Sequence, residues 1–188
     1  PPWPGQTEFI EKYFEVIDEL RSRGFSVLTF DWRGQGGSDR LLPDPRKAHI
    51  ADFTAYDEDL DAVIGTLANP AGLPAIAMAH SMGGNILLRR LHDRQGEFAA
   101  AVLCAPMLGI NPRGAPWRMV EMIARILNRR GPSPEFVWGM AARDQLALPF
   151  AEQIVTSDAA RYARNQALLK ANPELRLNGP TWGWLGAA

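Results

Sequence analysis

The stretch Leu73-Pro-Ala-Ile-Ala-Met-Ala-His-Ser-Met-Gly-Gly84 decides the fold of this chain. Its first part is short and apolar, which predicts a buried strand over 73–79. Residues 80–84 form a predicted tight turn, and a helix is predicted over 85–93. The stretch therefore contributes a strand, a tight turn that holds Ser81, and a helix, in that order.

The elements that precede and follow this stretch repeat the same alternation. Apolar residues at helical spacing predict helices over 8–23 and 52–67. Short, mostly apolar runs predict strands over 25–31 and 99–105. Strands that alternate with helices imply right-handed crossovers and a parallel sheet, so the predicted fold class is α/β.

The pattern changes after Pro106, because only helices are predicted there, over 117–130 and 158–171. We assign 1–106 to a sheet-bearing core and 107–188 to a helical insertion that covers the end of the sheet. Three predicted strands are too few for a sheet covered on both faces, and the chain starts without a methionine. We therefore expect an incomplete sheet, as in a piece of a longer protein.

The composition excludes several classes of protein. A chain of 188 residues that is 46% hydrophobic and 22% charged can bury one sizeable core. The net charge of -1, without a strongly basic segment, argues against a nucleic-acid partner. Cys104 is the single cysteine, so we expect a small buried side chain, no internal disulfide and a cytoplasmic protein. No apolar run approaches the roughly 20 residues of a membrane-spanning helix.

The turn at the serine resembles the nucleophile elbow of the α/β-hydrolase superfamily. This resemblance implies that Ser81 is the catalytic nucleophile and that the backbone N–H of Met82 donates to the oxyanion. Small residues must flank the serine, because the sharp turn brings strand and helix close together. Ala79, Gly83 and Gly84 meet this need, although Ala79 stands where the superfamily usually has glycine.

Two further segments narrow the resemblance to monoacylglycerol lipases and related lysophospholipases. Pro4-Gly-Gln-Thr-Glu-Phe-Ile-Glu-Lys-Tyr13 is similar to the segment that starts with His-Gly in these enzymes, with Pro4 in place of the histidine. The resemblance implies that the backbone N–H of Gln6, after Gly5, is the second oxyanion donor. Phe30-Asp-Trp-Arg-Gly-Gln-Gly-Gly-Ser-Asp39 is similar to their D-x-R-G-x-G-x-S loop, for which we expect a scaffolding role.

Histidines and carboxylates that could complete a catalytic triad are poorly placed. The fold's triad follows the order Ser, Asp or Glu, His, and no histidine follows His92. His92 would lie about 16 Å from the nucleophile along a helix, at roughly 1.5 Å per residue. We expect His80 to support the elbow, since adjacent side chains diverge at the end of a strand, and His49 to have a capping or surface role. Asp144 and Asp158 fall in the predicted cap, so we expect the triad acid and base to be absent from this chain.

The resemblance implies a serine hydrolase that cleaves carboxylic esters of glycerolipids through an acyl-enzyme on Ser81. Lysophospholipids and monoacylglycerols are the implied substrates, and no metal or organic cofactor is implied. Without its acid and base, this chain alone is expected to be inactive. Two alternatives stay open at this point. One is a non-catalytic lipid-binding module, and the other is an esterase or acyltransferase that acts on another acyl compound.

The predicted helix over 117–130 is amphipathic, with arginines opposite its apolar face. That face could rest on an anionic membrane, at the inner face of the cytoplasmic membrane, or it could cover an acyl pocket. Trp182 and Trp184 could line an acyl tunnel or fill the core. The sequence alone leaves both choices open.

Overall fold

A parallel three-stranded sheet forms the centre of the computed structural model, which describes residues 2–66, 72–112, 114–141, 144–153 and 155–188. The strand order is β1 (Pro2–Trp3), β3 (Ile76–His80), β4 (Ala100–Cys104). Trp3 pairs with Ala79, and His80 pairs with Cys104. The sheet confirms the predicted α/β class.

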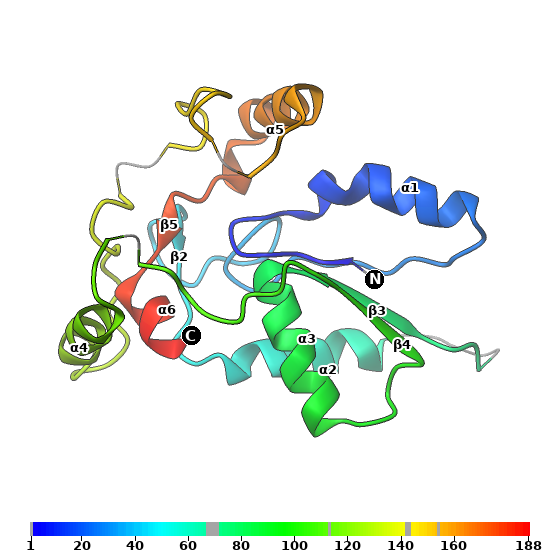
Figure 1. Cartoon of the computed structure of the whole chain (residues 1–188), viewed down its shortest axis with the longest axis horizontal. Coiled ribbons are helices and arrows are strands. Elements are labelled where there is room, and N and C mark those ends of the chain that lie inside the picture. The colour runs from blue at the N-terminus through cyan, green and yellow to red at the C-terminus, as the bar shows by residue number, and fades with distance from the viewer. Residues whose placement is uncertain (1, 67–71, 113, 142–143, 154) are drawn as a thin grey trace.

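Helices lie on both sides of this sheet (Figure 1). A 3-10 turn, η1 (Ile10–Tyr13), leads into α1 (Phe14–Ser22) on one side, and α2 (Thr54–Gly65) and α3 (Ser81–Asp93) lie on the other. Gly24, in the left-handed region at φ 87°, ends α1 as a glycine after a helix commonly does.

The regular elements of the second half of the chain are mainly helices, which lie toward the carboxyl ends of β3 and β4 (Figure 1). Its helices are α4 (Trp117–Leu127), α5 (Ala159–Ala171) and the short α6 (Trp182–Ala187), with a 3-10 turn, η2 (Pro173–Leu175), after α5. A second, two-stranded parallel sheet joins β2 (Lys47–Ala48) to β5 (Gly179–Pro180). This small sheet ties the end of the chain to the segment before α2.

Aromatic rings link these parts into one core. Trp32 packs edge-on against Trp3, with ring centroids 6.2 Å apart, and against Tyr56 at 5.3 Å. Phe53 continues the series to Tyr56 and to Trp184 at 5.5 Å. Trp184 is 3% exposed and belongs to the same buried cluster as β3 and α3. The chain end that carries α6 therefore packs into the core beside the sheet.

Most predicted elements form within three residues of their predicted ends. Two predictions differ from the structure, a strand over 25–31 and a turn over 80–84. The segment 25–31 is fully described and is not a strand. It runs near β1 and is joined to it by a side chain, since Thr29 Oγ1 donates to the Pro2 carbonyl. The predicted turn over 80–84 is shorter than expected, because the chain turns at Ser81 alone and α3 begins there instead of at residue 85. The predicted helix end at 67 lies outside the described residues.

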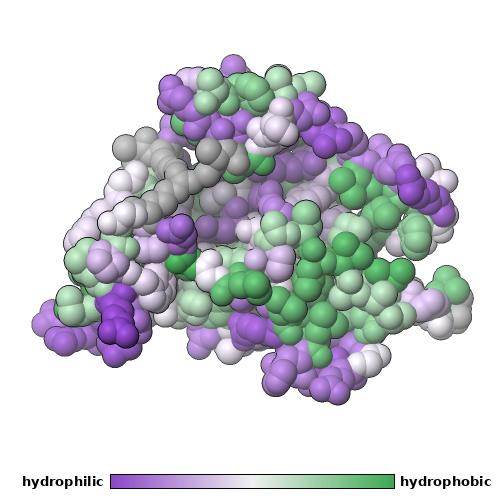
Figure 2. All heavy atoms as spheres, in the orientation of Figure 1, coloured by the Kyte–Doolittle hydropathy of each residue, from purple (hydrophilic) through white to green (hydrophobic). Residues whose placement is uncertain are grey.

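The expectation of a buried Cys104 was also wrong. Cys104 is exposed, because β4 is an edge strand whose outer side the described residues leave largely uncovered. Val102, in the same strand, is 45% exposed. Figure 2 shows apolar residues gathered over the region where β3 and β4 lie. Among the described helices, none has the length and apolarity needed to cross a bilayer.

Candidate active site

Ser81 occupies a strained position where β3 ends and α3 begins. Its φ is 51°, in the left-handed region, whereas His80 before it is extended at φ -118°. A non-glycine residue in this region costs on the order of 1 kcal/mol or more, and such strain collects at functional sites. One residue thus turns the chain from strand to helix, as the nucleophile-elbow resemblance requires.

Close backbone contacts explain the small residues around the serine. A Cβ added to Gly83 would lie 2.6 Å from the Trp3 carbonyl oxygen, and one added to Gly84 would lie 2.8 Å from Pro106 Cβ. Ala79 is 1% exposed, and its methyl group fits inside the core. The first turn of α3 therefore presses against β1 on one side and against the segment after β4 on the other.

The predicted oxyanion loop lies directly beside the serine. A Cβ added to Gly5 would lie 3.0 Å from Ser81 Cβ. Gln6 follows Gly5, so its backbone lies at the same place. Met82 is fully buried and is the second residue of α3, where backbone N–H groups have no partner within the helix. The structure thus brings together the loop and the helix start that carry the two predicted N–H donors.

A partly buried carboxylate, that of Glu8, supports this loop near the serine. Glu8 Oε2 accepts the Gly5 N–H at 2.6 Å and the Tyr13 hydroxyl at 2.5 Å, and it lies 2.9 Å from His80 Nδ1. Sequence reasoning had found neither Glu8 nor Tyr13, because both residues fit the ordinary pattern of a helix that starts with acidic residues. The His80 side chain faces this carboxylate and so lies against the loop that carries Gly5.

The segment 31–39 holds the same loop from another side. Asp31 Oδ1 accepts the Ile10 N–H at 3.0 Å, and Trp32 Nε1 donates to the Pro4 carbonyl at 2.9 Å. Gln35 is 3% exposed and bonds to the backbone of both Gly5 and Thr7. Burial raises the pKa of Asp31, although the backbone N–H of Gly37 counteracts it. These contacts are scaffolding contacts, and Gln35 is a residue that the sequence pattern alone did not single out.

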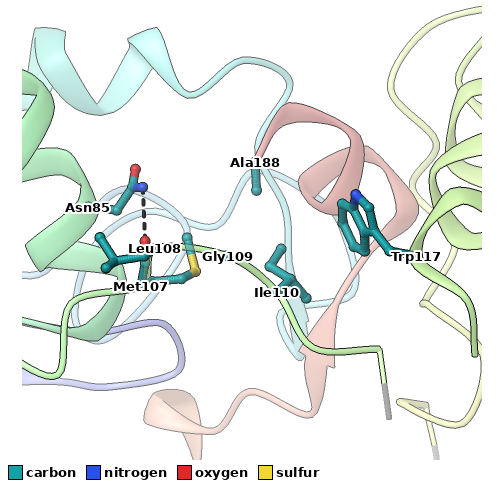
Figure 3. Close-up of a pocket in the computed structure, with 7 residues that line it drawn as sticks. All are labelled: Asn85, Met107, Leu108, Gly109, Ile110, Trp117 and Ala188. Atoms are coloured by element: carbon teal, nitrogen blue, oxygen red, sulfur yellow. Dashed lines mark hydrogen bonds between the residues drawn. The ribbon is translucent and has the colours of Figure 1, made fainter. Parts of the chain in front are cut away.

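A pocket of about 290 Å³ opens next to the first turn of α3 (Figure 3). Asn85, one turn after Ser81, donates through Nδ2 to the Met107 carbonyl at 2.9 Å and lines this pocket. Met107 also donates its N–H to the Ser81 carbonyl at 2.8 Å. The other lining residues are Leu108, Gly109, Ile110, Trp117 and Ala188, so the wall is largely apolar. Ser81 itself is not among the lining residues.

The remaining candidate residues have other partners. Asp158 caps α5, since its Oδ1 accepts the Ala160 N–H at 2.9 Å, and Asp144 accepts the Leu146 N–H at 2.9 Å. His92 is exposed and lies 2.7 Å from the Asp93 carboxylate. His49 lies 2.8 Å from Thr181 Oγ1 and contacts the start of α6, so the expected capping or surface role was wrong. Burial lowers the pKa of His49. Within the described residues, no three metal-ligating side chains come together.

Comparison with known proteins identifies the family of the chain. A family model described as serine aminopeptidase, S33, matches residues 3–188. Lysophospholipase L2 of Escherichia coli strain K12 is 39% identical over 186 residues, which cover 97% of this chain and 53% of that protein. Monoacylglycerol lipase of Mycolicibacterium smegmatis is 29% identical over 129 residues, which cover 68% of this chain and 44% of that protein. The chain therefore spans about half the length of these relatives.

A solved structure gives the fold independently. A soluble variant of monoglyceride lipase from Saccharomyces cerevisiae, in complex with a substrate analog, superposes with a TM-score of 0.68 at 22% identity. The superposition covers 99% of this chain and 56% of that one. This likeness confirms the α/β-hydrolase fold that the elbow resemblance implied. The chain belongs to the serine aminopeptidase S33 family of α/β hydrolases.

Proposed function

We propose that this chain carries the nucleophile and the oxyanion hole of a serine hydrolase that acts on carboxylic esters of glycerolipids. The observation that carries the proposal is Ser81 in a left-handed conformation between β3 and α3, with the Gly5 backbone against it. The names of the relatives, lysophospholipase and monoacylglycerol lipase, support the substrate class.

Ser81 Oγ attacks the ester carbonyl carbon while a general base takes its proton. The carbonyl oxygen becomes negative and accepts hydrogen bonds from the backbone N–H groups of Gln6 and Met82. Ser81 also stands at the N-terminus of the 13-residue helix α3, whose dipole favours negative charge there. The bond to the leaving group then breaks as the base passes the proton to the leaving oxygen, which departs as an alcohol. Water later cleaves the acyl-enzyme, which releases the fatty acid and restores the Ser81 hydroxyl.

We propose that the acid and base of this reaction come from sequence outside these 188 residues. The three histidines bond elsewhere, at Glu8, Thr181 and Asp93, and the relatives are about twice as long. We further propose that 1–106 is part of the hydrolase core and that 107–188 is its cap, with residues near the pocket of Figure 3 facing the acyl chain.

A fluorophosphonate probe tests the nucleophile. The probe is incubated with this chain and with its longest natural form, and any adduct is located by mass spectrometry. We expect Ser81 to be labelled in the long form and not, or only slowly, in this chain. Ser81→Ala should abolish labelling, and Ser22→Ala, which changes an exposed serine of α1, should leave it unchanged. A folded long form without an adduct on Ser81 would contradict the proposed nucleophile and would favour a non-catalytic lipid-binding module.

The substrate class is then tested by measuring the free fatty acid that the long form releases from candidate lipids. Lysophospholipids and monoacylglycerols should yield free fatty acid, with Ser81→Ala as the blank. Labelling of Ser81 without release from either lipid would instead support an esterase or acyltransferase for another acyl compound.

We also propose that α4 contacts an anionic membrane surface. Met119, Met122 and Ile126 are between 44% and 54% exposed, although Ala124 on the same helix is buried. Arg118, Arg125 and Arg129 on this helix and just after it are exposed, so the positive charge needed for anionic lipid lies beside the apolar side chains.

A further inference from the structure

Gln35 bridges the two ends of the predicted oxyanion loop. Its side-chain Nε2 donates to the Gly5 carbonyl at 2.8 Å, and its Oε1 accepts the Thr7 N–H at 3.2 Å. The partners fix which end of the amide is which, since a carbonyl needs a donor and an N–H needs an acceptor. Gln35 is 3% exposed, so water does not compete strongly for these bonds. The residue between the two anchored positions is Gln6.

The bond to Gly5 acts on the Gln6 N–H through the peptide group itself. The Gly5 carbonyl and the Gln6 N–H belong to one peptide unit, which is planar and trans, so they point in opposite directions. A donor that holds the oxygen therefore fixes the direction of the N–H. Donation to the carbonyl also polarises the peptide, which strengthens the hydrogen bond that the N–H gives.

The bond to Thr7 holds a conformation that the backbone does not favour. Thr7 has φ 59°, in the left-handed region that a β-branched residue rarely adopts. Its N–H ends on Gln35 Oε1, so the turn after Gln6 depends on this side chain. Gln35 is itself anchored, since its N–H donates to the Trp32 carbonyl at 3.1 Å and its carbonyl accepts the Ser38 N–H at 3.1 Å.

We propose that Gln35 is the residue that aims the Gln6 N–H at the developing oxyanion. It is a positioning residue, because it contacts the loop and not the substrate. An amide suits this task, since it supplies both a donor for the Gly5 carbonyl and an acceptor for the Thr7 N–H. The proposal rests on the proposed function, in which Gln6 donates to the oxyanion.

The test uses the long form of the protein with Gln35→Met, which keeps the side-chain size and removes both bonds. We expect kcat, counted per labelled Ser81, to fall about 10- to 100-fold with KM within about twofold, because loss of one oxyanion donor costs about 100-fold or more. Counting active sites with the fluorophosphonate removes any effect of partial unfolding. Ser38→Ala, which removes a side-chain bond to the Asp31 carbonyl in the same loop, is the matched control and should keep kcat.

Gln35→Glu tests the proposal through the pH dependence of kcat per active site, which a purely structural role of Gln35 would not change. A glutamate keeps the acceptor for Thr7 but places a second oxygen against the Gly5 carbonyl. Protonation restores a donor there. The ratio of variant to wild-type kcat per active site should therefore rise as the pH falls. If Ser81 is labelled in the wild type and Gln35→Met keeps its kcat per site, the positioning role is wrong while the proposed function stands. If wild-type Ser81 is never labelled, the proposed function fails first.

Discussion

One oxygen atom, Oε2 of Glu8, gathers three polar groups beside the nucleophile: the Gly5 N–H, the Tyr13 hydroxyl and His80 Nδ1. Burial raises the pKa of Glu8, but the bond to His80 and the charge of Lys12 outweigh it, and the pKa falls to about 2. The bond to Glu8 raises the pKa of His80, against the effect of burial. The charged forms of Glu8 and His80 therefore stabilise each other.

Glu8→Gln should lower the free energy of unfolding most strongly between about pH 4.5 and 6.5. The Glu8 contribution is present above its unfolded pKa and is lost as the pH falls toward about 2. The His80 contribution is present below its unfolded pKa and is lost as the pH rises through its folded one. At about 1.4 kcal/mol per pKa unit, the shift of Glu8 corresponds to at most about 3 kcal/mol.

Urea titrations of wild type and variant across this pH range measure the difference. Glu19→Gln is the control, because Glu19 pairs with Arg23 on the exposed surface of α1 and should matter little at any pH. A difference between wild type and Glu8→Gln that does not change with pH would show that ionisation of the pair contributes nothing.

We expect Gly83 to tolerate no side chain, whereas Gly65 should tolerate one. The Cβ of Gly83→Ala would meet the carbonyl oxygens of Trp3 and Pro4 at 2.6 and 2.7 Å, and backbone cannot easily move. We expect Gly83→Ala to destabilise by about 3 kcal/mol, at the upper end for overpacking. Gly65, at the end of α2, has open space around it, so Gly65→Ala should be neutral or stabilise by up to about 1 kcal/mol. Thermal unfolding measures both, and equal effects would contradict the close approach.

At the level of single residues, the sequence singles out positions whose structural requirements are local. Ser81, Gly83 and Gly84 follow from the tight turn, because only a few residue types allow it. Gln35 and Glu8 could not be predicted as a clamp around Gly5. Gln35 bonds to a carbonyl 30 residues away, and no spacing rule relates the two. Glu8 bonds to an N–H only three residues before it, but an acidic residue at this position also fits the ordinary start of a helix.

At the level of elements, a buried arginine of α3 joins this helix to α2 and to the segment that follows α3. The Arg90 side chain is 6% exposed and contacts Asp61 at 2.6 Å and Glu97 at 2.5 Å. Both bonds raise the pKa of Arg90, so it stays charged. The acidic residues of α2 thus face arginines and are more than a solvated surface.

Arg90→Met should destabilise the protein by about 3 kcal/mol, because it leaves the partly buried Glu97 carboxylate without its partner. Arg94→Met is the matched control, since Arg94 is 61% exposed and lies 3.8 Å from Asp61, so its loss should cost less than about 0.5 kcal/mol. Chemical denaturation gives both values. Similar losses for the two variants would show that burial does not strengthen the Arg90 pairs.

Elements with their own periodicity were predicted from sequence, whereas those that depend on a distant partner were not. The apolar run 25–31 has strand-forming residues but does not form a strand. The neighbouring strand β1 pairs with β3, and its contact with 25–31 includes a side-chain hydrogen bond from Thr29. Strands β2 and β5 are two residues each and pair across the length of the chain, so no local pattern marks them. The 3-10 turn before α1 was likewise not predicted, since helical spacing over 8–23 does not distinguish a 3-10 turn from the first turn of an α-helix.

For the whole molecule, the sequence predicted the fold class, and tertiary packing decided the rest. Trp182 and Trp184 were equally compatible with a tunnel or a core, and both are buried in the core cluster that includes α2. The apolar face of the helix over 117–130 was expected to be covered or to rest on a membrane. Ile123 and Ala124 pack inward, but Met122 is 54% exposed. Helical periodicity cannot show how far a neighbour covers a face.

The exposed part of α4 should make membrane binding by the long form depend on lipid charge. We expect tighter binding to vesicles that contain phosphatidylglycerol than to pure phosphatidylcholine, and weaker binding as salt rises, because arginines near the surface contribute about 1 kcal/mol each. Met122→Ser with Ile126→Ser should weaken binding about tenfold by removing apolar contact. Val155→Ser, at a side chain that is 85% exposed outside α4, is the control and should bind as wild type. Co-sedimentation measures the binding of all three proteins, each carrying Ser81→Ala so that lipid is not consumed. Equal binding to both vesicle types, unchanged in the double variant, would mean that α4 does not meet the membrane.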